Sequence, residues 1–201
     1  MPSLYSERLR LRAAERADIP MFVRWISDPE VTEHLLLRLP MSLAEEEIWF
    51  EQMLSRPAAE HVYVVEAKLP PVEGCPECQW LPIGNTAFIS ILEIDRCAEI
   101  GIMLGEKAWW NKGYGTEAMR LMLRHGFETL NLHRIWLQVY ANNQRGLRAY
   151  EKAGFQHEGF DGSGVTAALA ALHRRAVTHA VDPVEGDERL ALLVGPDARA
   201  T

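Results

Sequence analysis

Apolar and charged residues alternate strictly over residues 7–12, close to the start of the chain. Leu9 and Leu11 fall on one face of this segment and the arginines between and beside them fall on the other, which predicts a half-buried strand. Asp18 then precedes Pro20 and an apolar stripe over residues 21–26, a pattern typical of an N-cap followed by Pro in the first helical turn. A first strand followed by a first helix is therefore predicted.

The same reading predicts further elements along the chain, separated by Gly and Pro residues. Ser42 and Glu45 have capping-box spacing at the start of a helix over residues 43–54. Strands are predicted over 61–67, 83–92, 98–104 and 134–140, a helix over 116–130, and a short helix that Asn143 caps and Gly154 ends. This order predicts an α/β (α+β) fold.

Composition sets the class of protein. The chain has 201 residues, 48% of them hydrophobic, which suits one globular domain over 1–201. Its formal charge of −7 argues against nucleic acid as a partner, and no apolar run approaches a membrane span. The first residues carry charges before any apolar stretch and the chain has only three cysteines, so a cytoplasmic location is predicted.

A glycine loop lies between the predicted strand 98–104 and the helix that follows it. Lys112, Gly113, Tyr114, Gly115 and Thr116 form its core. Glycines allow close backbone approach to an anion, and the amides at a helix start favour phosphate, so the loop predicts a pyrophosphate site. The Gly-Lys-Ser/Thr ending of a Walker loop is missing. The dinucleotide fingerprint is matched in spelling only, because no carboxylate ends the next strand.

A second block, residues 142–155, contains Asn143, Tyr150 and a Tyr-x-Lys-x-Gly-Phe pattern. Together the two blocks resemble the GNAT superfamily of acetyl-CoA-dependent N-acetyltransferases, in particular its branch of ribosomal-protein-alanine and spermidine N-acetyltransferases. The resemblance covers residues 6–159. It implies a mixed, mainly antiparallel sheet flanked by helices, acetyl-CoA as cosubstrate, no metal, and transfer of acetyl to a primary amine by direct attack.

The resemblance also implies roles for individual residues. The loop Lys112, Gly113, Tyr114, Gly115 and Thr116 would bind the pyrophosphate of acetyl-CoA. The backbone of Ile102, Met103 and Leu104 would pair with its pantetheine arm, and Asn143 and Tyr150 would face the thioester. The sequence departs from the family pattern at Trp110, where Gln or Arg is usual, and at Gly146, where Ser is usual.

Acetyl transfer to an amine needs a base, an oxyanion donor and an acid for the leaving thiolate. Glu99 is the candidate base, provided that burial raises its pKa, and Tyr150 is the candidate acid. A strand amide, that of Met103, is the candidate oxyanion donor. The alternative for Glu99 is a structural ion pair with an arginine across the sheet.

The acceptor is a small amine such as a polyamine, or a protein N-terminus; an acyl-CoA-binding sensor without turnover and an aminoglycoside-type acetyltransferase are the alternatives. Residues 160–201 lack the family's closing hairpin, with an alanine-rich helix predicted over 165–177 and a strand over 190–194. Because dimer contacts of similar proteins often involve this region, a homodimer is left open.

Cys75 and Cys78 have ligand spacing but lack a second pair, so no metal is predicted. The run of glutamates at 45–47 is predicted to be a solvated helix face, and attraction of a cationic substrate is the alternative.

Overall fold

The computed structural model of the protein describes residues 3–35, 41–70, 80–160, 165–171 and 175–181. Within these ranges, nine strands form one mixed sheet in the order β1-β2-β3-β4-β5-β6-β8-β7-β9. The strands are β1 (Leu4–Tyr5), β2 (Leu9–Ala13), β3 (Tyr63–Lys68), β4 (Trp80–Leu92), β5 (Cys97–Leu104), β6 (Arg134–Tyr140), β7 (Phe155–Phe160), β8 (Val165–Ala171) and β9 (Arg175–Val181). Pairing is antiparallel from β1 to β5 and parallel between β5 and β6.

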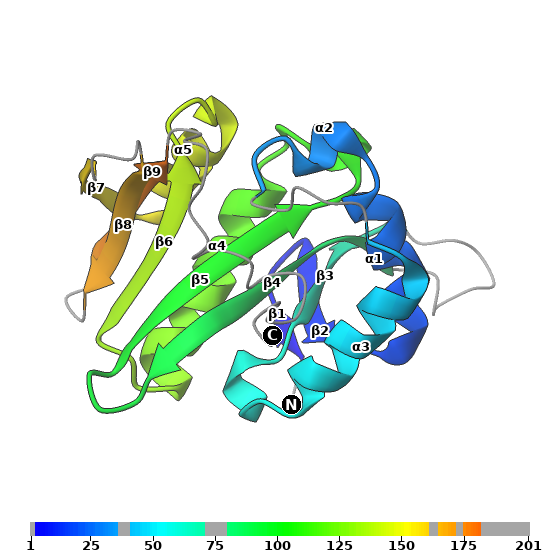
Figure 1. Ribbon diagram of the computed structural model, residues 1–201. Coiled ribbons are helices and arrows are strands. Elements are labelled where there is room, and N and C mark those ends of the chain that lie inside the picture. The colour runs from blue at the N-terminus through cyan, green and yellow to red at the C-terminus, as the bar shows by residue number, and fades with distance from the viewer. Residues whose placement is uncertain (1–2, 36–40, 71–79, 161–164, 172–174, 182–201) are drawn as a thin grey trace, which may run out of the picture.

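Helices lie on both faces of the sheet (Figure 1). They are α1 (Ile19–Ile26), α2 (Pro29–Thr32), α3 (Leu43–Leu54), α4 (Tyr114–Arg124), which continues as a π-helical turn (His125–Thr129), and α5 (Gln144–Ala153). Short 3-10 turns occupy Arg16–Asp18, Ala58–Glu60 and Lys107–Trp109. One buried cluster joins the sheet to α4, and a second joins the sheet to α1 and α3. Side chains of β5 pack into both clusters, one on each face of the sheet.

Three predicted elements, α3, β6 and α5, are confirmed. Helix α3 has the predicted bounds, and Ser42 and Glu45 form the reciprocal capping box. Strand β6 also has its predicted bounds. Helix α5 starts after Asn143 and ends at Gly154, whose φ of 111° is the left-handed conformation that glycine adopts without strain. Each of these caps depends on residues only a few positions apart, so the sequence alone is enough to predict it.

The prediction of a helix over residues 165–177 is wrong. The chain instead forms β8 and β9, which pair with each other in antiparallel register and with β7. The preference of alanine for helix is worth less than about 1 kcal/mol per residue, so pairing with neighbouring strands outweighs it. The strand predicted over 190–194 lies outside the described residues, as do Cys75 and Cys78.

The prediction that residues 45–47 form a solvated face is wrong for Glu46. This side chain is only 2% exposed, and its Oε2 atom has no hydrogen-bond partner. Burial raises the pKa of Glu46 to about 7, because an ionised carboxylate loses its hydration there. Glu46 shares the inner face of α3 with Trp49 and Met53, since residues three and seven positions apart lie on one side of a helix.

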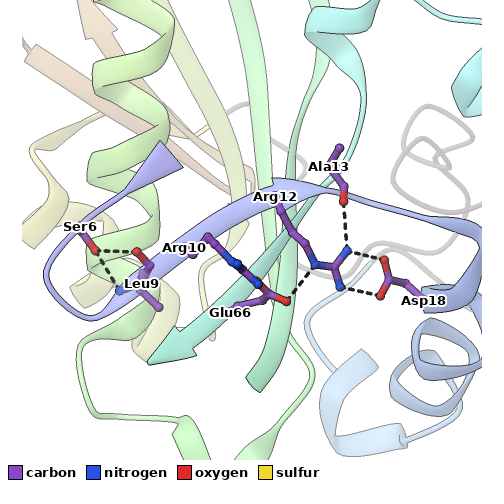
Figure 2. Close-up of polar contacts among 7 residues, drawn as sticks. All are labelled: Ser6, Leu9, Arg10, Arg12, Ala13, Asp18 and Glu66. Carbon is purple, nitrogen blue, oxygen red and sulfur yellow. Dashed lines mark hydrogen bonds and ion pairs between the residues drawn. The ribbon is translucent and has the colours of Figure 1, made fainter. Parts of the chain in front are cut away.

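An arginine–carboxylate network ties α1 to the sheet (Figure 2). Glu66, which is 4% exposed on β3, accepts hydrogen bonds from Arg10 Nε at 2.5 Å and Arg12 Nε at 2.8 Å. The Arg12 guanidinium also donates to both oxygens of Asp18 at 2.7 Å and to the carbonyl of Ala13. Asp18 therefore stands at the predicted N-cap of α1 but uses its carboxylate on Arg12 instead of on a helix amide.

Candidate active site

Strands β5 and β6 are paired only over their first residues. The register joins Cys97 to Arg134, Ala98 to Ile135, and Glu99 to Trp136, after which the two strands diverge (Figure 1). Residues 100–104 of β5 remain paired with β4 on their other side. No described strand covers the edge that they turn toward β6. Glu99 is thus the last residue of β5 before the strands separate.

Three contacts establish which backbone groups of β5 face this uncovered edge. Thr86 Oγ1 on β4 donates to the Gly101 carbonyl at 2.7 Å, and a Cβ placed on Gly84 of β4 would lie 2.1 Å from the Met103 carbonyl oxygen. The Leu104 carbonyl points the other way and accepts from Trp110 Nε1 at 2.8 Å.

The N–H and C=O groups of one strand residue point to the same side, and successive residues alternate. Gly101 and Met103 therefore face β4, whereas Ile102 and Leu104 face the uncovered edge. The uncovered edge therefore presents the Ile102 amide, and not that of Met103, which was the predicted oxyanion donor. The side chain of Met103 packs in the core with α1 and α3.

The glycine loop turns sharply into α4. Asn111 and Gly113 have φ values of 59° and 84°, in the left-handed region, and Gly113 is the N-cap. The Gly113 carbonyl accepts the first helical hydrogen bond from the amide of Glu117. The amides of residues 114–116 precede that bond, so they have no acceptor within the helix. Such a set of amides at a helix start can bind a phosphate oxygen.

The loop side chains have different surroundings. Thr116 Oγ1 donates to the Ala149 carbonyl at 3.1 Å and so joins α4 to α5. Lys112 Nζ lies 5.9 Å from the centroid of the Trp109 ring, and that ring packs edge-on against Tyr114 at 5.0 Å. The Thr116 hydroxyl therefore has a structural partner, while the Lys112 ammonium, held by its ring contact, is the positive charge of the loop.

Arg8, which lies near the start of the chain, contacts the loop directly and supports it, and its sequence pattern does not predict this role. Its guanidinium binds the Glu117 carboxylate at 2.5 and 2.9 Å and donates to the Lys112 carbonyl at 3.3 Å. It also lies 4.5 Å from the centroid of the Tyr114 ring. Glu117 is 109 residues from Arg8 along the chain, so local sequence pattern cannot reveal the pair.

Glu99 is a partly buried carboxyl group at the point where β5 and β6 separate. Burial raises the pKa of its carboxyl group to about 7. No described side chain forms a hydrogen bond or an ion pair with it. Arg134, which starts the neighbouring strand, pairs with Glu158 at 3.0 Å instead. The alternative of a structural ion pair for Glu99 is therefore not found among the residues described.

Tyr150 lies on α5, whereas Asn143 is the N-cap residue just before that helix. Tyr150 is partly buried against the core beside α4, and burial raises the pKa of its phenol to about 12. Asn143 caps the helix, with its Oδ1 accepting from the Gly146 amide at 2.8 Å. A Cβ on Gly146 would come within 2.7 Å of the Asn143 side chain, so this Asn143 conformation packs closely against the glycine. No bond joins Tyr150 to Glu99 in the described part of the chain.

The described residues show neither a metal-binding cluster nor a membrane-spanning helix. No group of three or more His, Cys, Asp or Glu side chains is placed to hold a metal ion, and Cys97 is a free thiol at the start of β5. None of the described helices is both long and apolar enough to cross a membrane.

Known proteins resemble this chain in sequence and in fold. The acetyltransferase (GNAT) domain family matches residues 8–156. An uncharacterized N-acetyltransferase, p20 of Bacillus licheniformis, is 32% identical over 161 residues, covering 79% of this chain and 85% of that protein. A spermidine N(1)-acetyltransferase of Vibrio cholerae is 28% identical over 155 residues, covering 77% of this chain and 82% of that protein.

The fold comparison agrees with these relatives. The crystal structure of spermidine N-acetyltransferase from Vibrio cholerae in complex with CoA and spermine superimposes with a TM-score of 0.71 at 25% identity, covering 84% of this chain and 98% of that one. The family match spans the diverging strands, the glycine loop and α5. With its mixed sheet, its glycine loop and these relatives, the chain belongs to the GNAT family of N-acetyltransferases.

Proposed function

We propose that the protein transfers acetyl from acetyl-CoA to a primary amine by direct attack of the amine on the thioester. The observation that carries this proposal is Glu99. It is a partly buried carboxyl group with a pKa raised to about 7, without a described partner, at the point where β5 leaves β6. A base with a pKa near the working pH is the group that an amine substrate, protonated in water, requires.

The residues present suit acetyl-CoA, which supplies a thioester carbonyl open to attack. The first-turn amides of α4, at residues 114–116, and the Lys112 ammonium offer donors and positive charge to a diphosphate. At the uncovered edge of β5 lie the backbone amide and carbonyl of Ile102 and the amide of Leu104. An added strand would form hydrogen bonds with these groups, and the amides of a pantetheine arm can do the same.

Three groups of the chain then act as base, oxyanion donor and acid. Glu99 takes a proton from the attacking amine, directly or through water. The Ile102 amide donates to the carbonyl oxygen as negative charge develops on it. The Tyr150 phenol gives its proton to the departing sulfur, and solvent returns one to the phenol. Asn143 holds the start of α5, and with it Tyr150, in place through the Gly146 amide.

For the acceptor, we propose a small cationic amine. Relatives named spermidine N(1)-acetyltransferase and the formal charge of −7 both support a polyamine. An N-terminal Ala or Ser of a protein is the competing acceptor, and the ribosomal-protein branch of the resemblance suggests it. A homodimer and a cytoplasmic location remain predictions.

The roles of Glu99 and Tyr150 are tested by kinetics on conservative variants. Tyr150→Phe and Glu99→Gln should each lower kcat by about 100-fold, the lower end of the range for a general acid or base, while the Kd for acetyl-CoA changes less than about twofold. An unchanged kcat in Tyr150→Phe would remove Tyr150 as the acid. Acetyl-CoA binding without turnover on any amine would favour an acyl-CoA sensor.

A further inference from the structure

Arg145, on the first turn of α5, forms a contact with the glycine loop that the proposed chemistry does not use. The carbon at the centre of its guanidinium lies 3.6 Å from the centroid of the Trp110 ring. Trp110 is itself fixed by the hydrogen bond from its Nε1 atom to the Leu104 carbonyl, at 2.8 Å. These two contacts link the last residue of β5 to the start of α5, the helix that carries Tyr150.

The guanidinium is partly buried and has no ion-pair partner among the described residues. Desolvation lowers the pKa of Arg145, yet a guanidinium stays protonated in proteins. Three groups act on its charge from nearby: Glu30 on α2, Glu33 just beyond that helix, and Tyr150 on its own helix. Glu30 is engaged with Lys107 at 2.9 Å, so it does not neutralise Arg145 directly.

Among the side chains that the structure describes on α4 and β7, none brings a competing charge to the Tyr150 phenol. On α4, Arg120 donates to the Lys152 carbonyl. On β7, Phe155 packs edge-on against the Tyr150 ring at 5.9 Å, and both His157 and Glu158 are exposed. Burial raises the pKa of Tyr150 to about 12, and the positive charge of Arg145 opposes that rise. Among the described residues, Arg145 is the charged group that lowers the pKa of the Tyr150 phenol and so makes it a better acid.

We propose that Arg145 is a positioning residue for acetyl transfer: stacked on Trp110, it holds its positive charge beside Tyr150 and stabilises the phenolate that proton donation leaves behind. This inference rests on the proposed function. In the transfer, the amine N–C bond forms as the thioester C–S bond breaks, the thiolate takes the Tyr150 proton, and the phenolate regains one from solvent. Arg145 lowers the cost of the intervening charged state without touching the reacting atoms.

The stack with Trp110 is what makes arginine the suitable cation. A guanidinium is planar and can lie flat on an indole while remaining charged, whereas an ammonium group is a compact, strongly hydrated charge. Trp110 directly precedes the loop residues Asn111 to Thr116, so its ring supports a cation from α5 at the start of the glycine loop.

The test compares Arg145→Gln, Arg145→Lys and, as a control on the same helix, Arg148→Gln, in which an exposed arginine is lost. Arg145→Gln should lower kcat about tenfold with little change in the Kd for acetyl-CoA. Arg145→Lys should recover part of that loss, and Arg148→Gln should match the wild type. A raised Kd with unchanged kcat would overturn the inference, because Arg145 would then be a ligand of the cofactor.

Two further variants separate an effect through Tyr150 from a general disturbance of α5. In a Tyr150→Phe background, Arg145→Gln should cause no additional loss of kcat, since the two residues would act as one unit. Replacing Tyr150 by 3-fluorotyrosine, whose phenol is more acidic, should restore kcat in Arg145→Gln. Additive losses, or no rescue, would contradict the inference. If Tyr150→Phe alone leaves kcat unchanged, it is the proposed role of Tyr150 that fails.

Discussion

The Arg8 guanidinium binds the Glu117 carboxylate at 2.5 Å, which joins the residue just before β2 to the first turn of α4. Ser6 donates to the other oxygen of the same carboxylate at 2.6 Å. The helix start that would bind the pyrophosphate is therefore held from the N-terminal part of the chain. A loop whose amides must converge on an anion gains from such support, because a fixed loop loses less entropy on binding.

Arg8→Ala should weaken acetyl-CoA binding by about threefold to tenfold, since the loop loses its contacts with Arg8 at both Lys112 and Glu117. Calorimetric titration measures the change. Glu117→Gln should have a similar effect, and the double variant should be no weaker than the worse single variant. Lys68→Ala, which removes an exposed charge near Arg8, is the control. An unaltered Kd in Arg8→Ala would show that the loop needs no such support.

Glu66→Gln should destabilise the fold by about 3 kcal/mol or more, because it removes the buried carboxylate that Arg10 and Arg12 share. The free energy of unfolding in urea measures this cost. Glu51→Gln, which breaks an ion pair with Arg16 whose side chains are both more than half exposed, should cost less than about 1 kcal/mol. Equal losses in the two variants would contradict the importance given to the network of Figure 2.

Activity should depend on pH through Glu99. The carboxylate accepts a proton only when it is ionised, so its contribution is lost as the pH falls below the raised pKa of about 7. The ratio of kcat/KM between the wild type and Glu99→Gln isolates this effect from titration of the amine. That ratio should rise from about pH 6 to about pH 8 and then level off. A ratio that is the same at every pH would show that Glu99 is structural.

Stability should depend on pH through Glu46. Burial raises its pKa from 4.5 to about 7, so the folded protein holds this proton more tightly than the unfolded chain does. The stability that the neutral carboxyl group provides is present below pH 4.5 and is lost as the pH rises through about 7. Glu46→Gln should therefore be more stable than the wild type at about pH 8, by on the order of 3 kcal/mol. At about pH 4.5 the difference should be small.

Urea unfolding of both proteins at the two pH values provides the measurement. The comparison uses the difference between them, so titration of all other groups cancels. A constant difference across this pH range would mean that Glu46 is ionised in the folded protein, and the burial argument would then fail.

The sequence predicts those features whose causes lie within a few residues. The Ser42 and Glu45 capping box and the Asn143 and Gly154 caps depend on short-range geometry, and the structure has them where predicted. The glycine loop is likewise local, since Gly113 supplies its left-handed φ from a single position.

The features that sequence reasoning missed depend on pairing between distant segments. Arg8 meets Glu117 only after the sheet has formed, and the direction of the Met103 amide follows from its register with Asn85 on β4. Glu46 lies in a run of three glutamates, and only the packing of α3 shows which one is buried. The strands β8 and β9 are alanine-rich, so their identity comes from pairing and not from composition.

The most direct test of the proposed function is calorimetric titration of the purified protein with acetyl-CoA, followed in the same preparation by thiol release with spermidine and with a peptide starting in Ala or Ser. Acetyl-CoA binding together with thiol release in the presence of spermidine is the expected result. Release with the peptide alone would keep the acetyl transfer and change the acceptor. Absence of acetyl-CoA binding would contradict the role of the loop from Lys112 to Thr116 and the function built on it.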